Sequence, residues 1–300
     1  MKRQIQSVLC ILLAMILAIP GFAQDKRTLD TKVADILAQF PAPGFGHADR
    51  LAGEMAALGQ EGLAKFFALI VPAGTGDDTQ ARYALSSLSR YAGAPGHENL
   101  RGLTEKSFLT ALGQASDQEV KAYYIRELAF CGQSPTIAAL APYLETKGLS
   151  SPAVATLTSI GTEEAAKAIF TSLKNQSGDS KIELIKAVGT LKYKPAEAFL
   201  ITMYEKANAE TQLQILASLA QNGGPASAKL FKQAAEKAGY AADPAETMVA
   251  YVDYARQLAR NGDTKLSNSL ATAALKKCIK KEQLHFRSAA LEILRANQGE

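Results

Sequence analysis

The sequence predicts an all-α protein, an α-solenoid in which antiparallel helix pairs stack in a row. Composition is the first of three supporting observations: 47% of the 300 residues are hydrophobic, only 7% are aromatic, and tryptophan is absent. Alanine and leucine are prominent, which favours closely packed helices over strands rich in β-branched and aromatic residues. The other two observations are a helical spacing of apolar side chains and an internal repeat.

The first 23 residues differ from the rest of the chain. Lys2 and Arg3 precede an apolar run from Val8 to Ile19, and Pro20 and Gly21 end that run. This pattern is typical of a secretory signal peptide that is removed from the mature protein. A membrane anchor is the less favoured reading, because a spanning helix needs about 20 apolar residues. We therefore expect an exported protein, periplasmic or secreted, with no membrane span after cleavage.

The charge of the chain gives little sign of a nucleic-acid partner. The formal net charge is +4, and it falls to +2 without Lys2 and Arg3. The nearest approach to a basic block is Lys276-Lys277 with Lys280-Lys281, which we interpret as a solvated surface. A nucleic-acid footprint needs a basic stripe or patch, so no nucleic-acid binding is expected.

Two cysteines, Cys131 and Cys278, remain after the predicted cleavage. Export permits disulfides, but each cysteine occupies an apolar position of a predicted helix, in units far apart in the stack. Free cysteine often behaves as a small buried hydrophobe. We expect two buried thiols.

An internal repeat is marked by four glycines at spacings of 29, 28 and 34 residues: Gly132, Gly161, Gly189 and Gly223. A large aliphatic residue stands four places before each glycine, and these residues are expected to occupy equivalent buried positions: Leu128, Leu157, Ile185 and Leu219. Each glycine is predicted to end a helix in the left-handed conformation. Ser134 and Thr162 are predicted to cap the helices that follow.

The central part of the chain resembles HEAT repeats. Asp117 to Lys121, followed by Ile125, Leu128 and Gly132, resembles a second helix of such a repeat, and Gly161 to Leu173 resembles a first helix. Pro142 lies where first helices of that family are often kinked. The resemblance predicts HEAT-like repeats over 116–239. The flanking parts, 24–115 and 240–300, are expected to be helical cap regions, because the terminal units of a repeat array are atypical.

A narrower resemblance covers most of the mature chain. It rests on four segments: Leu29–Pro41, Ala235–Tyr240, Gly262–Lys265 and Ala289–Leu294. They are similar to the helical N-terminal region of exported Bacteroidota-type proteins that carry a downstream, β-rich 3-keto-disaccharide hydrolase-type domain. The resemblance implies a helical accessory region of a larger glycan-processing enzyme. No segment here reads as that β-rich domain, so no catalytic residue is carried over.

The two ends are also predicted to be helical. Residues 29–115 show four or five apolar stripes at helical spacing, interrupted by a turn-rich loop from Val71 to Asp78. Asp77-Asp78 is predicted to cap a helix that starts at Thr79. A long helix is predicted from Asp243-Pro244 to about Gly262, Asp263 is predicted to cap the next, and Leu284 to Leu294 closes the array.

No catalytic or metal-binding constellation is found. The three histidines, His47, His97 and His285, are far apart and lack a paired-ligand spacing. Neither a nucleophile elbow nor a phosphate-binding loop is present. The chain is therefore predicted to be no enzyme and to hold no metal or cofactor.

The expected function is that of a non-catalytic interaction scaffold, whose concave helical surface receives a protein or polymer partner. Residues spaced by three or four lie on one side of a helix, which suggests two contact surfaces. One comprises Lys121, Tyr123, Arg126 and Glu127, and its counterpart comprises Tyr251 and Tyr254. The alternative function is the accessory region of a secreted glycan-processing enzyme. The partner and the oligomeric state are left open.

Overall fold

The computed structural model describes residues 25–175 and 180–299, and the predicted signal peptide lies outside them. The described residues form sixteen α-helices and four short 3₁₀ helices, with no strand among them. The all-α prediction is confirmed. The N-terminal helices are α2 (Leu29–Leu37), α3 (Phe45–Ala57), α4 (Gly59–Phe67), α5 (Thr79–Gly93), α6 (Glu98–Gln114), α7 (Gln118–Cys131), α8 (Ser134–Leu140) and α9 (Ser150–Ile160). The C-terminal helices are α10 (Glu163–Asn175), α11 (Ser180–Thr190), α12 (Glu197–Tyr204), α13 (Ala209–Asn222), α14 (Ala228–Lys237), α15 (Thr247–Arg260), α16 (Thr264–Lys277) and α17 (Leu284–Gln298).

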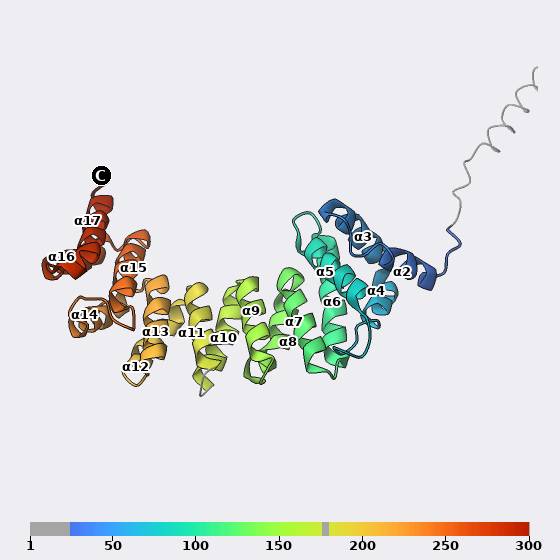
Figure 1. Cartoon of the computed structure of the whole chain (residues 1–300), viewed down its shortest axis with the longest axis horizontal. Helices are drawn as coiled ribbons and strands as arrows, with labels where there is room; N and C mark the ends of the chain where they lie inside the picture. The colour runs from blue at the N-terminus through green and yellow to red at the C-terminus, as the bar shows by residue number, and fades with distance from the viewer. Residues whose placement is uncertain (1–24, 176–179, 300) are drawn as a thin grey trace, which may run out of the picture.

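The helices follow one another in an extended row, and most helices that are neighbours in sequence pack together (Figure 1). From α3 to α17, every odd-numbered helix also contacts the next odd-numbered helix. We call this continuous series the odd-helix layer. Both ends of the row bend toward the side on which α9, α11 and α13 lie (Figure 1). The odd-helix layer therefore lines the inner side of the bend.

Helix α13 illustrates how the sequence specifies one element of this layer. The Asn208 side chain accepts a hydrogen bond from the Thr211 N–H at the start of the helix. Ile215, Leu216 and Leu219 form a fully buried stripe at helical spacing. Gly223 ends the helix with φ +61°, a conformation that costs glycine little. The capping residue, the spacing of the apolar residues and the terminating glycine thus all specify the same helix.

The repeat register predicted from the glycines is confirmed at the aliphatic positions. Leu128, Leu157, Ile185 and Leu219 all have a relative exposure of 0%. They lie on α7, α9, α11 and α13, which are consecutive members of the odd-helix layer. Their burial is part of one hydrophobic core that continues from α2 to α17.

The four marker glycines have two different structural roles. Gly161 and Gly223 take left-handed φ values of +72° and +61° at helix ends, as predicted. For Gly132 and Gly189 that prediction is wrong. Gly132 ends α7 in an extended conformation, and Gly189 lies inside α11. At Gly189 an added Cβ would be 2.7 Å from the Ser218 Cα atom, so this glycine permits the close approach of α11 and α13.

Side chains tie each unit to the backbone of another unit about thirty residues away. The buried Glu105 carboxylate on α6 accepts hydrogen bonds from the N–H groups of Gln133 and Thr136 and from the Thr136 hydroxyl, at 2.7–3.1 Å. It thereby caps the start of α8. Glu197 on α12 accepts from the Ser227 N–H and hydroxyl in the same way. These contacts fix the relative position of consecutive units, because each satisfies groups that a helix end leaves unpaired.

The predicted caps are partly correct. The Thr162 hydroxyl accepts from the Ala165 N–H, as expected. Ser134 is not a cap, because it is the first residue of α8 and its hydroxyl donates to the Glu164 carboxylate. Near Pro142 the backbone changes from α-helix to 3₁₀ helix at Ala141, which fits the expected kink.

Both cysteine thiols are expected to be unreactive in the folded protein. Cys131 and Cys278 are free and buried, as predicted. Burial raises the pKa of the Cys131 thiol to about 12 and raises that of Cys278 as well. Since the thiolate is the reactive species, a disulfide reagent at pH 8 should modify neither thiol until denaturant is added. Rapid modification of the native protein would contradict this packing.

Candidate functional site

The surface predicted on α7 is only partly exposed. Arg126 is exposed and Lys121 is half-buried, but Tyr123 and Glu127 have relative exposures of only 6% and 8%. The expectation that all four side chains share an open face is therefore wrong for Tyr123 and Glu127. A binding role for Lys121 and Arg126 stays a prediction.

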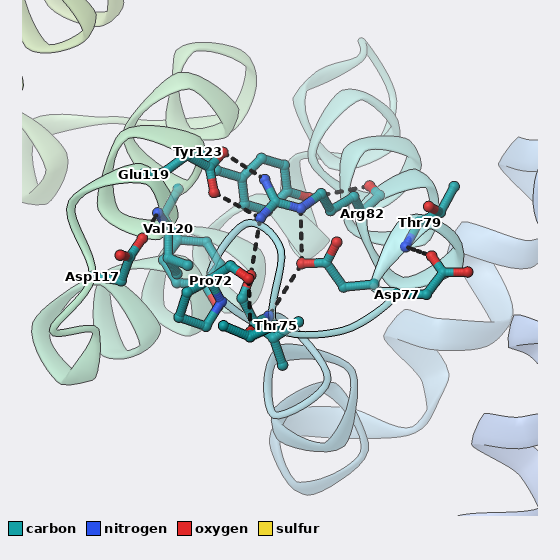
Figure 2. Close-up of polar contacts among 12 residues, drawn as sticks. Pro72, Thr75, Asp77, Thr79, Arg82, Asp117, Glu119, Val120 and Tyr123 are labelled. Carbon is teal, nitrogen blue, oxygen red and sulfur yellow. Dashed lines mark hydrogen bonds and ion pairs between the residues drawn. The ribbon is translucent and has the colours of Figure 1, made fainter.

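Tyr123 is covered by a cluster of ionic contacts around Arg82 (Figure 2). The Arg82 guanidinium reaches from α5 to the Glu119 carboxylate at 2.8 and 2.9 Å and to Asp78 at 2.9 Å. It also lies 4.7 Å from the centre of the Tyr123 ring, and the Tyr123 hydroxyl donates to the Arg82 carbonyl. The hydrogen bonds to Glu119 raise the pKa of Arg82, whereas burial raises that of Tyr123.

The Arg82 cluster connects the loop at 71–78 to α5 and α7. Asp78 accepts from the Val71 N–H, and Arg82 donates to the Val71 carbonyl. Asp77 accepts from the Thr79 N–H at the start of α5, which confirms the capping prediction for this residue, whereas the Asp78 side chain does not cap the helix. The polar side chains drawn in Figure 2 bond mainly to one another and to backbone, so we interpret this cluster as structural.

Glu127 joins the same two helices. Its carboxylate oxygens accept hydrogen bonds from the Ser86 and Ser89 hydroxyls on α5, each at 2.6 Å. A buried carboxylate needs such donors to offset the loss of water. Glu127 therefore holds α5 against α7.

The tyrosines on α15 are core residues. Tyr251 and Tyr254 have relative exposures of 1% and 0%. The Tyr251 hydroxyl donates to the Leu270 carbonyl on α16, and the Tyr254 hydroxyl donates to the Gly224 carbonyl. The Tyr254 ring is stacked on Phe231 at 4.2 Å. The predicted exposed surface at these two residues is therefore wrong, because they fill the interior of neighbouring units.

The opposite side of α15 is open. Val249, Asp253, Arg256 and Arg260 are spaced by four, three and four residues and so lie on one face. A hollow of about 550 Å³ lies between this face and α13, and a second of about 410 Å³ lies between it and α17. Arg256 and Arg260 line both hollows. We call the two together the α15 groove; its other lining residues include Leu213, Ala217, Ala220, Glu246, Ala250, Gln257, Glu292, Ile293 and Asn297.

Small side chains create the α15 groove. Ala217 and Ala220 on α13 and Ala250 on α15 line the first hollow, and Ala259 and Ala296 line the second. An alanine leaves space that a leucine at the same position would fill. Gln221 and Gln257 stand beside this apolar surface, and their amides can both donate and accept hydrogen bonds.

The two arginines of the groove are held differently. The Arg256 guanidinium lies 3.3 Å from an Asp253 oxygen and 3.5 Å from a Glu292 oxygen, which are long contacts to two exposed carboxylates. Arg260 is exposed and makes no hydrogen bond or ion pair with the described residues. A guanidinium matches carboxylates with paired N–H donors. The groove thus presents one weakly held and one free anion-binding group.

Glu246, at the other end of the first hollow, has an unusual backbone conformation. It immediately precedes α15, which starts three residues later than predicted, and its φ is +47°. Such values are uncommon for residues other than glycine, asparagine and aspartate. The structure thus places a carboxylate on the hollow through a conformation that a glutamate rarely adopts.

Replacing Glu246 with glycine is expected to raise the stability of the protein slightly. Glycine adopts the left-handed conformation without steric cost, and a gain of up to about 1 kcal/mol is expected from the relief of strain. Thermal unfolding followed by circular dichroism measures it. A clear fall in melting temperature would show that the Glu246 side chain is itself structural.

Two features are absent from the described residues. None of the helices in the described part of the chain is long and apolar enough to cross a membrane. Among residues 25–175 and 180–299, no group of three or more histidine, cysteine, aspartate or glutamate residues is arranged to hold a metal ion.

The arrangement of the α15 groove could be found from sequence only in part. The spacing of Val249, Asp253, Arg256 and Arg260 is visible, but charged residues at such spacing also occur on any solvated helix. What marks this face is the pairing with Ala217 and Ala220 on α13. That pairing depends on how two units stack.

Comparison with known proteins adds no family assignment. No protein-family model matches the chain. A comparison with curated proteins likewise finds no match.

Proposed function

We propose that the protein is an exported, HEAT-like α-solenoid that acts as a non-catalytic scaffold and binds an extended segment of a protein partner in the α15 groove. The observation that carries the proposal is the pair of hollows on either side of one helix face, both lined by Arg256 and Arg260. Stacked helix pairs characteristically offer an extended surface of this kind to a partner.

The composition of the groove supports a protein segment as its occupant. An apolar surface of alanines with Val249 accepts small apolar side chains, and Val249 is 48% exposed in the free protein. Glutamine amides and guanidinium groups along the edges provide donors for main-chain carbonyls and carboxylates. Export rests on the predicted signal peptide, and the repeat architecture rests on the odd-helix layer and the equivalent buried residues.

The alternative is a helical accessory region of a larger secreted glycan-processing enzyme. Its support is the sequence resemblance described above. In that case the groove would hold a segment of the catalytic domain instead of a separate protein.

Photo-crosslinking tests the proposal. A photoreactive amino acid at Val249 is expected to give a covalent adduct of defined mass in the cell envelope of a producing strain, and mass spectrometry identifies the partner. Adding Arg256→Ala and Arg260→Ala to the same protein should remove the adduct, because these substitutions remove the two guanidinium groups from the groove.

The matched control carries the photoreactive residue at Lys229, an exposed position on α14. It should give no adduct of that mass. The proposal fails if both positions give the same products, or if the arginine substitutions leave the Val249 adduct unchanged.

A further inference from the structure

We infer that the α15 groove selects an extended peptide segment with a basic side chain near one end and an acidic side chain about six or seven residues away. This inference rests on the proposed function and specifies the chemistry of the partner. It follows from the order of charges along a single hollow.

The first hollow extends along the whole of α15, because both Glu246 and Arg260 line it. Glu246 immediately precedes the helix, and Arg260 is its last residue. At a rise of 1.5 Å per residue, their Cα atoms are about 21 Å apart along the axis. An extended chain covers this distance with about six or seven residues, at roughly 3.3 Å each.

The charges that line this hollow are ordered along its length. Glu246 and Asp253 stand at the N-terminal end and middle, and Arg256 and Arg260 follow toward the C-terminal end. Asp253 and Arg256 partly neutralise each other. Glu246 and Arg260 make no ion pair with the described residues, so the two ends of the hollow carry unlike, unpaired charges.

A complementary segment therefore needs a cation at the Glu246 end and an anion at the Arg260 end. Between them, Ala217 and the exposed Val249 present an apolar surface, and Ala220 and Ala250 form its buried floor, which leaves room for small side chains. Acidic residues near the start and basic residues near the end of a helix also suit the helix dipole. The order of charges could therefore serve helix stability or ligand selection. Only a measurement of binding distinguishes the two roles.

The experiment is a selection of peptides from a phage-displayed library of random dodecapeptides on the immobilised mature chain, residues 24–300. Peptides enriched on the wild type should carry a lysine or arginine and a glutamate or aspartate separated by five to eight residues. On the Arg260→Glu protein, the acidic position should be replaced by a basic one.

A synthetic peptide from the wild-type selection then gives affinities by fluorescence anisotropy. Its binding should weaken about fivefold for Glu246→Gly, as expected for one exposed charge contact. It should weaken further for Arg260→Glu, which replaces attraction by repulsion. Lys229→Glu on α14 serves as the control and should leave the affinity unchanged. Glu246→Gly is informative because it removes the carboxylate and at the same time relieves the strain of the left-handed backbone conformation at this position.

The outcomes separate the inference from the proposed function. Peptides that lose affinity with Arg256→Ala but show no spaced charge pair would overturn the inference and leave the groove as a binding site. Enriched peptides whose affinity is unchanged by every groove substitution would overturn both. So would the absence of enriched peptides together with the absence of a crosslink from Val249.

Discussion

Replacing Leu157 with alanine is expected to lower the free energy of unfolding by about 2–5 kcal/mol, as truncations of buried leucines do. Leu157 is fully buried on α9, at the centre of the odd-helix layer. The change removes apolar contacts and leaves a cavity between rigid neighbouring helices, which cannot fully collapse. Urea unfolding measured by circular dichroism gives the difference.

Leu291→Ala on α17 provides the matched control. Leu291 is 36% exposed, so the same change of side chain should cost only about 0.5 kcal/mol, in the range of surface substitutions. Equal effects at the two positions would mean that the repeat register places Leu157 incorrectly.

Replacing Gly93 with alanine is expected to have the second large effect, a loss of about 1–3 kcal/mol or more from overpacking. Gly93 is the last residue of α5, and an added Cβ would lie 2.0 Å from the Phe130 carbonyl oxygen on α7. This oxygen belongs to the backbone of α7, so it cannot rotate away from the added methyl group as the end of a flexible side chain could. The two helices must separate, which weakens the packing on both sides of the contact.

Replacing Gly102 with alanine should have the opposite effect on stability. Gly102 lies inside α6, and nothing is within 4 Å of an added Cβ there. Alanine should therefore stabilise the protein by about 0.5–1 kcal/mol through helix propensity alone. A comparison of melting temperatures checks the pair. Two similar shifts would contradict the close approach of α5 and α7.

Much of the fold was predictable because its determinants are local. The stripes that place Leu128, Leu157, Ile185 and Leu219 in the core need only helical periodicity and a repeat spacing. Caps such as Thr162 and Asp263 act within three residues of themselves. Patterns of this kind can be seen in a single sequence.

Other features were missed because they depend on contacts between units. Glu105 caps a helix that begins about thirty residues later, and nothing near Glu105 in sequence shows this. Gly189 serves a close approach of helices instead of a helix end. Such roles are determined by how the helices stack.

The candidate site was the least predictable part. The sequence pattern places the tyrosines at 123, 251 and 254 on contact surfaces. Large aromatic side chains gain more from burial when their hydroxyls find partners, and here each hydroxyl donates to a backbone carbonyl. The α15 groove lies on the side of α15 opposite Tyr251 and Tyr254, and its charged residues have a spacing that also occurs on any solvated helix.

The most direct test of the proposed binding site is the dissociation constant of the partner identified by crosslinking, measured for two double variants. Arg256→Ala with Arg260→Ala alters the α15 groove, and Lys121→Ala with Arg126→Ala alters the surface predicted on α7. With melting temperatures unchanged in both, the groove variant is expected to bind at least tenfold more weakly and the α7 variant to bind within twofold of the wild type. The reverse result would contradict the proposal and return the binding site to α7.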